Sequence, residues 1–410
     1  MNIIFVTNGS FGTNDATGGM LDNLFEGLPE TKILQYSIRP ILQTDNNPIS
    51  IVSFLPDIKY SIFSTWIYRI DQKLKQKRHI RIWKVIRSGL FFMDEIIPPF
   101  VTPKELHNLD SFDPDLIYTL AGDIKVLRIS RILAKRYNKA IVIHNMDDYY
   151  NIDCNSSHYV RRVFNALLRK EYKLAYRYSY KSLAIGPKMA KEYSELFNLP
   201  FDWVMNCVKS DNINKLDTLN PKVSLIIFSG GLHGGRANTL SAIAQCIETI
   251  KGIKLEIYTG KADKEKNEAL FNNFNNTSLY EYVAKDKMFD NLSRADVLLH
   301  VESYEPQYIT YFRLSMSTKI PEYMASCRPI LCVGPSCIAT VDFIKEYRIG
   351  HVVHDVDKFD DALLEMQNAE YRNQLVVNAT CCLNEYFTKS KMQNKLNKVF
   401  DFNINASTSI

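Results

Sequence analysis

The sequence STKIPEYMASCRPIL, residues 317–331, joins a helix start, a lysine and the beginning of a strand. Ser317 and Thr318 carry hydroxyl groups that can cap a helix, and the proline that follows suits a first helical turn because its missing N–H would have no partner there. Free N–H groups at a helix start favour an anion, and Lys319 adds a full positive charge. Glu322, just inside the helix, can accept hydrogen bonds from a polyol such as a ribose. An anion site beside a hydroxyl acceptor predicts a sugar-nucleotide site.

Short apolar runs alternate with helical patterns along the rest of the chain. Such alternation predicts a parallel sheet covered by helices on both faces. The expected strands are Asn2–Val6, Asp115–Leu120, Lys139–His144, Ser182–Ile185 and Phe201–Val208 in the first half, and Ser224–Ser229, Lys254–Thr259, Leu279–Val283, Val297–Val301 and Pro329–Val333 in the second.

A polar stretch at 209–222 separates the two series of strands and reads as a linker. The 410 residues are enough for two domains, each with its own core. We therefore expect an α/β chain with one domain at 1–208, a second at 209–385, and a terminal segment at 386–410 that packs back on the first. Two doubly wound domains in tandem have a cleft between them, and such sheets bind ligands at the carboxyl ends of their strands.

Composition excludes several classes of protein. With 46% hydrophobic and 23% charged residues the chain is an ordinary globular one, and a net charge of +5 argues against a dedicated nucleic-acid binder. The eight cysteines show no CxxC spacing and match no zinc template, so we expect reduced thiols. No basic leader opens the chain and no apolar run reaches the length of a membrane span, which predicts a cytoplasmic protein.

A glycine-rich loop, GGLHGGR at 230–236, follows the first strand of the second series. Gly230, Gly231 and Gly235 allow backbone N–H groups to approach a phosphate closely, and Arg236 can hold a diphosphate with its two-pronged guanidinium. The alternative is a tight strand-to-helix turn with a solvated arginine. Together with Lys319, the loop favours the phosphate reading.

This loop and the later KIPEYMASCRPI segment resemble the retaining glycosyltransferases of the GT-B fold, in the large family-four group and of the bacterial surface-polysaccharide type. The resemblance extends over ADVLLH at 295–300 and the segments 334–335 and 342–353. It implies two tandem Rossmann-like domains with an interdomain cleft, the first on the acceptor side and the second binding the nucleotide sugar. It also implies that Arg236 and Lys319 hold the donor diphosphate and that Glu322 holds the ribose.

One departure from the family pattern concerns a second glutamate. Many members carry two glutamates eight residues apart, and the position eight residues before Glu322 is Leu314. Glu305, in an expected long loop over Glu302–Ser317, is a candidate counterpart near the sugar, although a solvated carboxylate is an equal alternative. The sugar site would otherwise be lined by Arg313, Ser317 and Thr318.

In the first domain, the expected strand ending at His144 is followed by two carboxylates, Asp147 and Asp148. A histidine at the carboxyl end of a parallel strand can bond a sugar hydroxyl, and the segment resembles the family's His-x-x-Asp-Asp. The resemblance makes His144 a sugar contact and places both carboxylates near donor or acceptor; a purely structural histidine is the alternative. Gly18 and Gly19 open the first helix, whose N-terminus can receive an acceptor hydroxyl or the donor phosphate.

The expected function is transfer of a hexose from a UDP- or GDP-sugar to a glycan or lipid-linked acceptor, with retention, in cell-surface polysaccharide synthesis. Arg236, Lys319 and His144 would be catalytic. Two adjacent aspartates are not the Asp-x-Asp of metal-dependent transferases, so we expect no metal and no cofactor. A nicotinamide dehydrogenase is disfavoured, because the first strand is not followed by Gly-x-Gly-x-x-Gly. A sugar-nucleotide epimerase of the same fold and a non-catalytic nucleotide-sugar-binding subunit remain alternatives.

Two segments are rich in basic residues. Arg69–Arg87 carries eight cations against one acid, with apolar residues at near-helical spacing, and aromatic and aliphatic residues follow it. Basic amphipathic helices suit an anionic membrane surface, so we expect peripheral contact with the inner face of the cell membrane; a solvated basic face is the alternative. For the similar segment Val160–Tyr180 we favour core packing.

Overall fold

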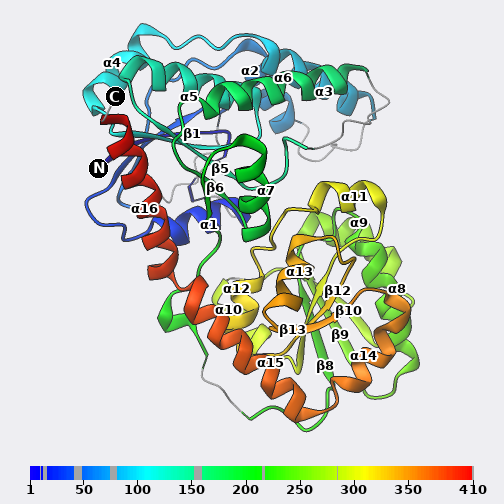
Figure 1. The fold of residues 1–410 in the computed structure, drawn as a ribbon. Helices are drawn as coiled ribbons and strands as arrows, with labels where there is room; N and C mark the ends of the chain where they lie inside the picture. The colour runs from blue at the N-terminus through cyan, green and yellow to red at the C-terminus, as the bar shows by residue number, and fades with distance from the viewer. Residues whose placement is uncertain are drawn as a thin grey trace. The chain divides into compact units, whose positions relative to one another are not determined.

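The computed structural model describes residues 1–9, 11–12, 16–40, 49–73, 81–151, 159–214, 218–283 and 285–408. The chain forms two compact units. Met1–Val204 and Gln393–Ile410 make the first, and Met205–Met392 make the second. Each unit contains one parallel sheet with helices on both faces (Figure 1).

The first unit is built on a seven-stranded sheet in the order β3-β2-β1-β4-β5-β6-β7. Its strands are β1 Asn2–Thr7, β2 Lys32–Ser37, β3 Val52–Phe54, β4 Leu116–Leu120, β5 Ile141–Asn145, β6 Ser182–Ala184 and β7 Phe201–Trp203. Its helices are α1 Ala16–Phe25, α2 Ile62–Lys73, α3 Arg81–Ile96, α4 Pro103–Phe112, α5 Ile124–Tyr137, α6 Tyr159–Tyr176, α7 Pro187–Phe197 and most of α16 Lys389–Thr408. Every residue of β4 and β5 is buried, as expected for strands covered on both faces.

An aromatic cluster ties the end of the chain to the first sheet. Phe5 of β1 lies against Tyr118 of β4 with ring centroids 5.2 Å apart, and Phe25 of α1 packs on the same tyrosine at 5.5 Å. Phe400 of α16 meets Tyr118 edge-on at 5.7 Å and is fully buried. Aromatic rings bury large apolar areas, so this helix completes the core of the first unit.

The second unit is built on a six-stranded sheet in the order β10-β9-β8-β11-β12-β13. Its strands are β8 Leu225–Ser229, β9 Lys254–Thr259, β10 Thr277–Glu281, β11 Val297–Val301, β12 Ile330–Val333 and β13 Gly350–Val353. Its helices are α8 Arg236–Thr249, α9 Lys261–Phe271, α10 Lys285–Arg294, α11 Pro306–Phe312, α12 Ile320–Ala325, α13 Ala339–Glu346, α14 Phe359–Glu365 and α15 Ala369–Cys382, with short 3₁₀ turns at Ser210–Asn212 and Val356–Lys358 and a π-helical turn at Leu383–Phe387.

The structure corrects the expected long loop over Glu302–Ser317, because α11 occupies its middle. The proline at the first position of α11 has a fixed backbone angle that suits a helix start. The prediction of a loop did not take this signal into account. Lys75, Lys77 and Arg78 of the first basic segment, and Cys154, lie outside the described residues. Among the described residues, no helix combines the length and apolar character needed to cross a bilayer.

Candidate functional site

The glycine loop lies at the carboxyl edge of the second sheet, between β8 and α8. Gly234 and Gly235 adopt positive φ angles of 67° and 78°, a region that side chains disfavour. A Cβ on Gly235 would lie 2.2 Å from the hydroxyl of Ser303 and 2.9 Å from a carboxylate oxygen of Glu305. Only glycine therefore lets this loop approach the segment that follows β11.

Arg236, the first residue of α8, is held by a buried carboxylate. Its Nη2 donates to Oε2 of Glu302 at 2.8 Å, and its Nε donates to the Val301 carbonyl at 3.2 Å. Burial alone would raise the pKa of Glu302, but Arg236 and a 3.0 Å contact from His300 lower it to about 2. Nη1 of Arg236 has no hydrogen bond to another described residue, so one prong of the guanidinium is available for a ligand.

Lys319 and Glu322 lie together at the start of α12. The lysine Nζ is 3.2 Å from Oε2 of Glu322, and about a third of the lysine side chain is exposed. The buried side chain of Asn206 donates to the Thr318 carbonyl at 2.9 Å and to the other glutamate oxygen at 3.4 Å. Glu322 is therefore oriented from two sides while remaining partly open to solvent.

Tyr282, just after β10, was not anticipated from the sequence. Its ring centroid lies 5.7 Å from Nζ of Lys319, a cation–π distance. Tyr282 is 42% exposed, and its partial burial together with the nearby carboxylates of Asp263 and Glu322 raises its pKa to about 12. Asp263 in turn accepts a 2.8 Å hydrogen bond from the backbone of Leu232 in the glycine loop. This tyrosine therefore lies between the two predicted motifs, and only its position after an expected strand could have suggested it.

Two buried hydroxyls at the same edge have no protein partner. Ser229 is the last residue of β8, and Thr259 is the last residue of the neighbouring β9. The side-chain oxygen of each is shielded from solvent and makes no hydrogen bond within the described structure. Buried polar atoms are normally satisfied, and exceptions in native proteins call for an explanation such as a ligand or water.

The remaining donor-side predictions have mixed outcomes. Glu305 is the N-cap of α11, and its two oxygens accept from Asn238 at 2.9 Å and Gln307 at 2.6 Å. The expected hydroxyl cap on α12 is wrong: Lys319 itself occupies the N-cap position, and the hydroxyl of Ser317 makes only a 3.4 Å contact with the lysine N–H. Thr318 contributes its backbone carbonyl to Asn206.

In the first unit, His144 is corrected from a sugar contact to a core residue. It is fully buried; its Nε2–H donates to the Val204 carbonyl at 2.9 Å, and Nδ1 lies 2.6 Å from the hydroxyl of Tyr118. Because a carbonyl only accepts, the neutral ring must carry its proton on Nε2. Burial lowers the pKa of His144 to about 4, which keeps it uncharged.

Asp148 is likewise a structural residue. It is 1% exposed and accepts 2.8 Å hydrogen bonds from the hydroxyl of Tyr193 and the amide of Asn151, which fold the turn after β5 onto α7. Burial with these partners leaves it unable to reach a ligand. Asp147 is only partly buried.

Gly18 and Gly19 lie in the first turn of α1, as expected. A Cβ on Gly19 would meet no atom of the described residues within 4 Å, so nothing in the described part of the chain requires glycine there. Glycine inside a helix costs stability relative to alanine. A ligand that approaches the backbone is one reason for keeping it.

We expect Gly19→Ala to raise the free energy of unfolding by about 0.5–1 kcal/mol and to lower the transfer rate by at least about 10-fold, because the methyl group displaces the ligand. Urea unfolding and turnover of the full chain measure the two effects. Gly89→Ala on α3, where the space is equally open, is the matched control and should leave turnover unchanged. Full activity in Gly19→Ala would remove α1 from the binding site.

A buried ion network at the carboxyl edge of the first sheet was also missed. Nη2 of Arg39, after β2, contacts Glu95 of α3 at 2.7 Å and Asp123, after β4, at 3.1 Å. Burial, with repulsion from Asp123, raises the pKa of Glu95 to about 7. Lys125 pairs with Asp94 at 2.5 Å and donates its backbone N–H to Glu95 at 3.0 Å. The network anchors α3 to the sheet edge.

Comparison with known proteins shows which families and folds the chain is similar to. Residues 226–394 match the family described as glucosyltransferase 3-like, C-terminal domain. The fold is similar to sucrose-phosphate synthase from Thermosynechococcus elongatus, at 11% identity and TM-score 0.68 over 99% of both chains. It is also similar to an α,α-trehalose-phosphate synthase (UDP-forming) from Burkholderia vietnamiensis, at 12% identity and TM-score 0.64 over 100% of this chain and 98% of that one. A third similar structure is a glycosyltransferase involved in lipopolysaccharide biosynthesis, at 9% identity and TM-score 0.53 over 97% and 99% of the chains.

No curated protein matches the sequence. The fold and the family match together define the chain as a glycosyltransferase with the two Rossmann-like domains of the GT-B fold. Its second unit in particular is similar to the glucosyltransferase 3-like C-terminal domain.

Proposed function

We propose that the chain transfers a hexose from a UDP-sugar to a hydroxyl of a glycan or lipid-linked acceptor, with retention, in the synthesis of a cell-surface polysaccharide. One observation carries this proposal: two cations, Arg236 and Lys319, and the carboxylate of Glu322 gather at the carboxyl edge of the second sheet, around a glycine loop. UDP is favoured over GDP because one structural neighbour is described as UDP-forming. The polysaccharide role is suggested by the neighbour involved in lipopolysaccharide biosynthesis.

The barrier to such a reaction is charge separation between an oxocarbenium-like sugar and a departing diphosphate. Arg236 would use its open Nη1 and Lys319 its partly exposed Nζ to stabilise the developing phosphate charge, which is commonly the largest catalytic contribution. Both cations are already positioned before a ligand binds, because Glu302 holds Arg236 and Glu322 holds Lys319. With no carboxylate at the usual place near the sugar, the departing phosphate would itself take the acceptor proton.

Glu322 and Tyr282 would recognise the nucleoside. The glutamate is oriented by Asn206 and can accept from both ribose hydroxyls, while the tyrosine ring offers a face on which a base can stack. The unpaired hydroxyls of Ser229 and Thr259 at the same edge would then find partners in the ligand or its water.

We expect Glu322→Gln to weaken UDP binding by about 10-fold, because the amide loses charge-assisted hydrogen bonds to the ribose. A 2′,3′-dideoxy analogue should bind the wild type and Glu322→Gln equally, since it lacks those hydroxyls.

Tyr282→Ala should weaken the binding of both UDP and the dideoxy analogue. Tyr280→Ala, on the exposed face of β10, is the control. Calorimetric titration gives the Kd values. Equal losses for UDP and its dideoxy analogue in Glu322→Gln would contradict the ribose contact.

A panel of nucleotide sugars tests the donor proposal more broadly. A ligand that binds only the folded state stabilises it by about 2.7 kcal/mol at 100 times its Kd, which raises the melting temperature. UDP-sugars should raise it and ADP-sugars should not. A shift with GDP-sugars alone would overturn the choice of base, and no shift with any of them would overturn the donor site.

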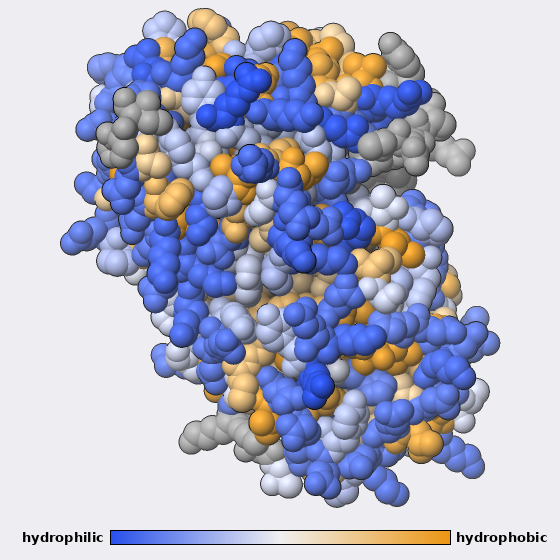
Figure 2. Space-filling model, in the orientation of Figure 1, coloured by the Kyte–Doolittle hydropathy of each residue, from blue (hydrophilic) through white to orange (hydrophobic). Residues whose placement is uncertain are grey.

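We also propose peripheral contact with an anionic membrane through the α2–α3 end of the first unit. Large apolar side chains are exposed there; they are Ile62 (59% exposed), Trp66 (48%), Ile86 (48%), Met93 (42%), Ile97 (39%) and Phe100 (75%). Figure 2 shows hydrophobic residues among hydrophilic ones along this part of the surface. An apolar face with cations beside it suits the interface of an anionic bilayer.

The double change Trp66→Ser/Phe100→Ser should lower partitioning onto anionic liposomes by at least about 10-fold, since each aromatic would lose roughly 1.5–3 kcal/mol of burial. Flotation at low and high salt measures it. Phe402→Ser is the control and should float like the wild type, because Phe402 lies on α16 and is 49% exposed, about as much as Trp66. Equal flotation of all three proteins, or none at low salt, would contradict membrane contact through this surface.

A further inference from the structure

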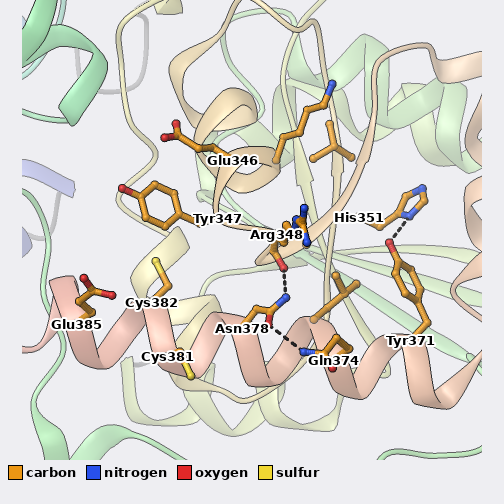
Figure 3. Close-up of a pocket in the computed structure, with 14 residues that line it drawn as sticks. Glu346, Tyr347, Arg348, His351, Tyr371, Gln374, Asn378, Cys381, Cys382 and Glu385 are labelled. Carbon is orange, nitrogen blue, oxygen red and sulfur yellow. Dashed lines mark hydrogen bonds between the residues drawn. The ribbon is translucent and has the colours of Figure 1, made fainter.

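A cavity in the second unit lies away from the residues assigned to the donor. It has a volume of about 730 Å³, in the range of ligand sites, and is enclosed by the end of α13, the first half of β13 and one face of α15. Figure 3 shows α15 along one side, with Tyr347, Arg348 and His351 facing it from the other. We call this cavity the α15 groove.

The α15 groove opens at the opposite edge of the sheet from the donor residues. It is lined by Gly350 and His351, the first two residues of β13. Arg236 lies after the carboxyl end of β8, and Lys319 lies after the carboxyl end of β11. In a parallel sheet all amino ends lie on one edge, so the two sites are separated by the length of the strands. A ligand in the groove would not compete with the donor.

The chemistry of the lining excludes several ligand classes. The two permanent cations, Lys345 and Arg348, are balanced by two carboxylates, Glu346 and Glu385, which argues against a phosphorylated or sulfated ligand. Apart from the two cysteines, the only aliphatic lining residues are Val352 and Leu375, too few for a lipid chain or an apolar helix. The remaining walls are aromatic rings and planar polar groups.

Those planar groups are held in place by one another. The hydroxyl of Tyr371 lies 2.9 Å from Nδ1 of His351, and Gln374 donates to Asn378 at 3.0 Å (Figure 3). Asn378 donates at 3.0 Å to the carbonyl of Arg348, whose φ of 51° turns the backbone sharply. Arg348 is exposed, and its guanidinium makes no hydrogen bond or ion pair with any other described residue.

We propose that the α15 groove binds a neutral oligosaccharide, such as a stretch of the glycan that the enzyme extends. Tyrosine rings can lie against the apolar faces of sugar rings, and amides, guanidinium and carboxylates supply paired donors and acceptors for the hydroxyls. Electroneutrality and the scarcity of aliphatic walls match a ligand that is polar throughout but uncharged. Only the choice of glycan as the natural ligand depends on the proposed function; binding of a neutral oligosaccharide does not.

Two exposed cysteines give a direct test. Cys381 lines the groove and Cys337 lies after β12 at the opposite edge of the sheet, so peptide-mapped alkylation of the full chain reports on both places separately. The probes are neutral glucose hexasaccharides with α1,4, β1,4 and α1,6 linkages, a sulfated hexasaccharide, and UDP. At concentrations several times its Kd, at least one neutral hexasaccharide should slow alkylation of Cys381 by about threefold or more and leave Cys337 unaffected.

The double variant Arg348→Gln/Gln374→Ala should lose this protection, while Asn373→Ala, the neighbouring exposed residue outside the groove, should keep it. UDP should not protect Cys381 in any variant. The proposal is overturned if no neutral hexasaccharide protects Cys381, if only the sulfated one does, or if the double variant is protected like the wild type. UDP binding is measured in the same samples by calorimetry, so failure of the donor site would be seen independently of the groove.

Discussion

Replacing Lys319 with alanine is expected to lower sugar transfer by at least about 100-fold while changing stability by no more than about 1 kcal/mol. The two effects separate because Lys319 is partly exposed and its pairing with Glu322 is a solvated i,i+3 contact, which contributes little to folding. In the proposed mechanism its charge acts when the diphosphate departs. Turnover and urea unfolding of the same protein measure both quantities.

Lys358→Ala is the matched control for this change. Lys358 also forms an i,i+3 pair with a carboxylate, Asp361, at 3.7 Å, and both side chains are exposed. It should leave transfer and stability as they are. If Lys319→Ala retained near wild-type turnover, the lysine would have no part in stabilising the leaving group, and the assignment of the donor site to this edge would lose one of its two cations.

Arg236→Ala is expected to have the largest effect on folding, a loss of about 3–5 kcal/mol in the second unit, because it leaves the carboxylate of Glu302 buried without its partner. Loss of activity in this variant alone would therefore say nothing about catalysis. The double variant Arg236→Met/Glu302→Gln removes both charges and should recover most of the stability. It should still fail to transfer sugar if the guanidinium acts on the diphosphate.

The pH dependence of stability tests the pairing of Arg236 with Glu302. The pKa of Glu302 is lowered from 4.5 to about 2, so the stability it contributes in the wild type is complete above pH 4.5 and is lost as the pH falls towards 2. In Arg236→Ala burial is no longer offset, and protonation of Glu302 at low pH relieves the penalty. The difference in unfolding free energy between the two proteins should shrink markedly between pH 7 and pH 3. An unchanged difference would mean that Glu302 does not depend on Arg236.

The sheets could be predicted from the sequence because their central strands are continuous apolar runs. The segment NIIFVT at β1 and the strand β8 leave no alternative to burial on both faces. The region between β1 and β4 could not be predicted from the sequence in the same way. Strand β2 carries a glutamine, β3 is only three residues long, and α2 and α3 carry several cations. Their placement depends on tertiary contacts such as the pairing of Arg39 with Glu95.

The predictions for individual residues divide along a similar line. Arg236, Lys319 and Glu322 lie where local patterns placed them, at helix starts after strands of the second sheet. His144 could not be judged from the sequence, because its burial results from the pairing of its two ring nitrogens with residues 26 and 60 positions away. Tyr282 was missed for the same reason: its neighbours Asp263, Lys319 and Glu322 lie at the starts of two helices that are distant from one another in the sequence.

The stereochemistry of the product tests the central claim most directly. The 410-residue chain would be incubated with UDP-α-glucose and other α-linked UDP-sugars, with and without a panel of glycoside acceptors, and the reaction would be followed by proton NMR. We predict release of UDP together with a product that keeps the α configuration, and no isomerised nucleotide sugar when acceptor is absent. A β-linked product would contradict retention, a donor converted to an isomer would indicate the epimerase, and nucleotide binding without any turnover would indicate a non-catalytic subunit.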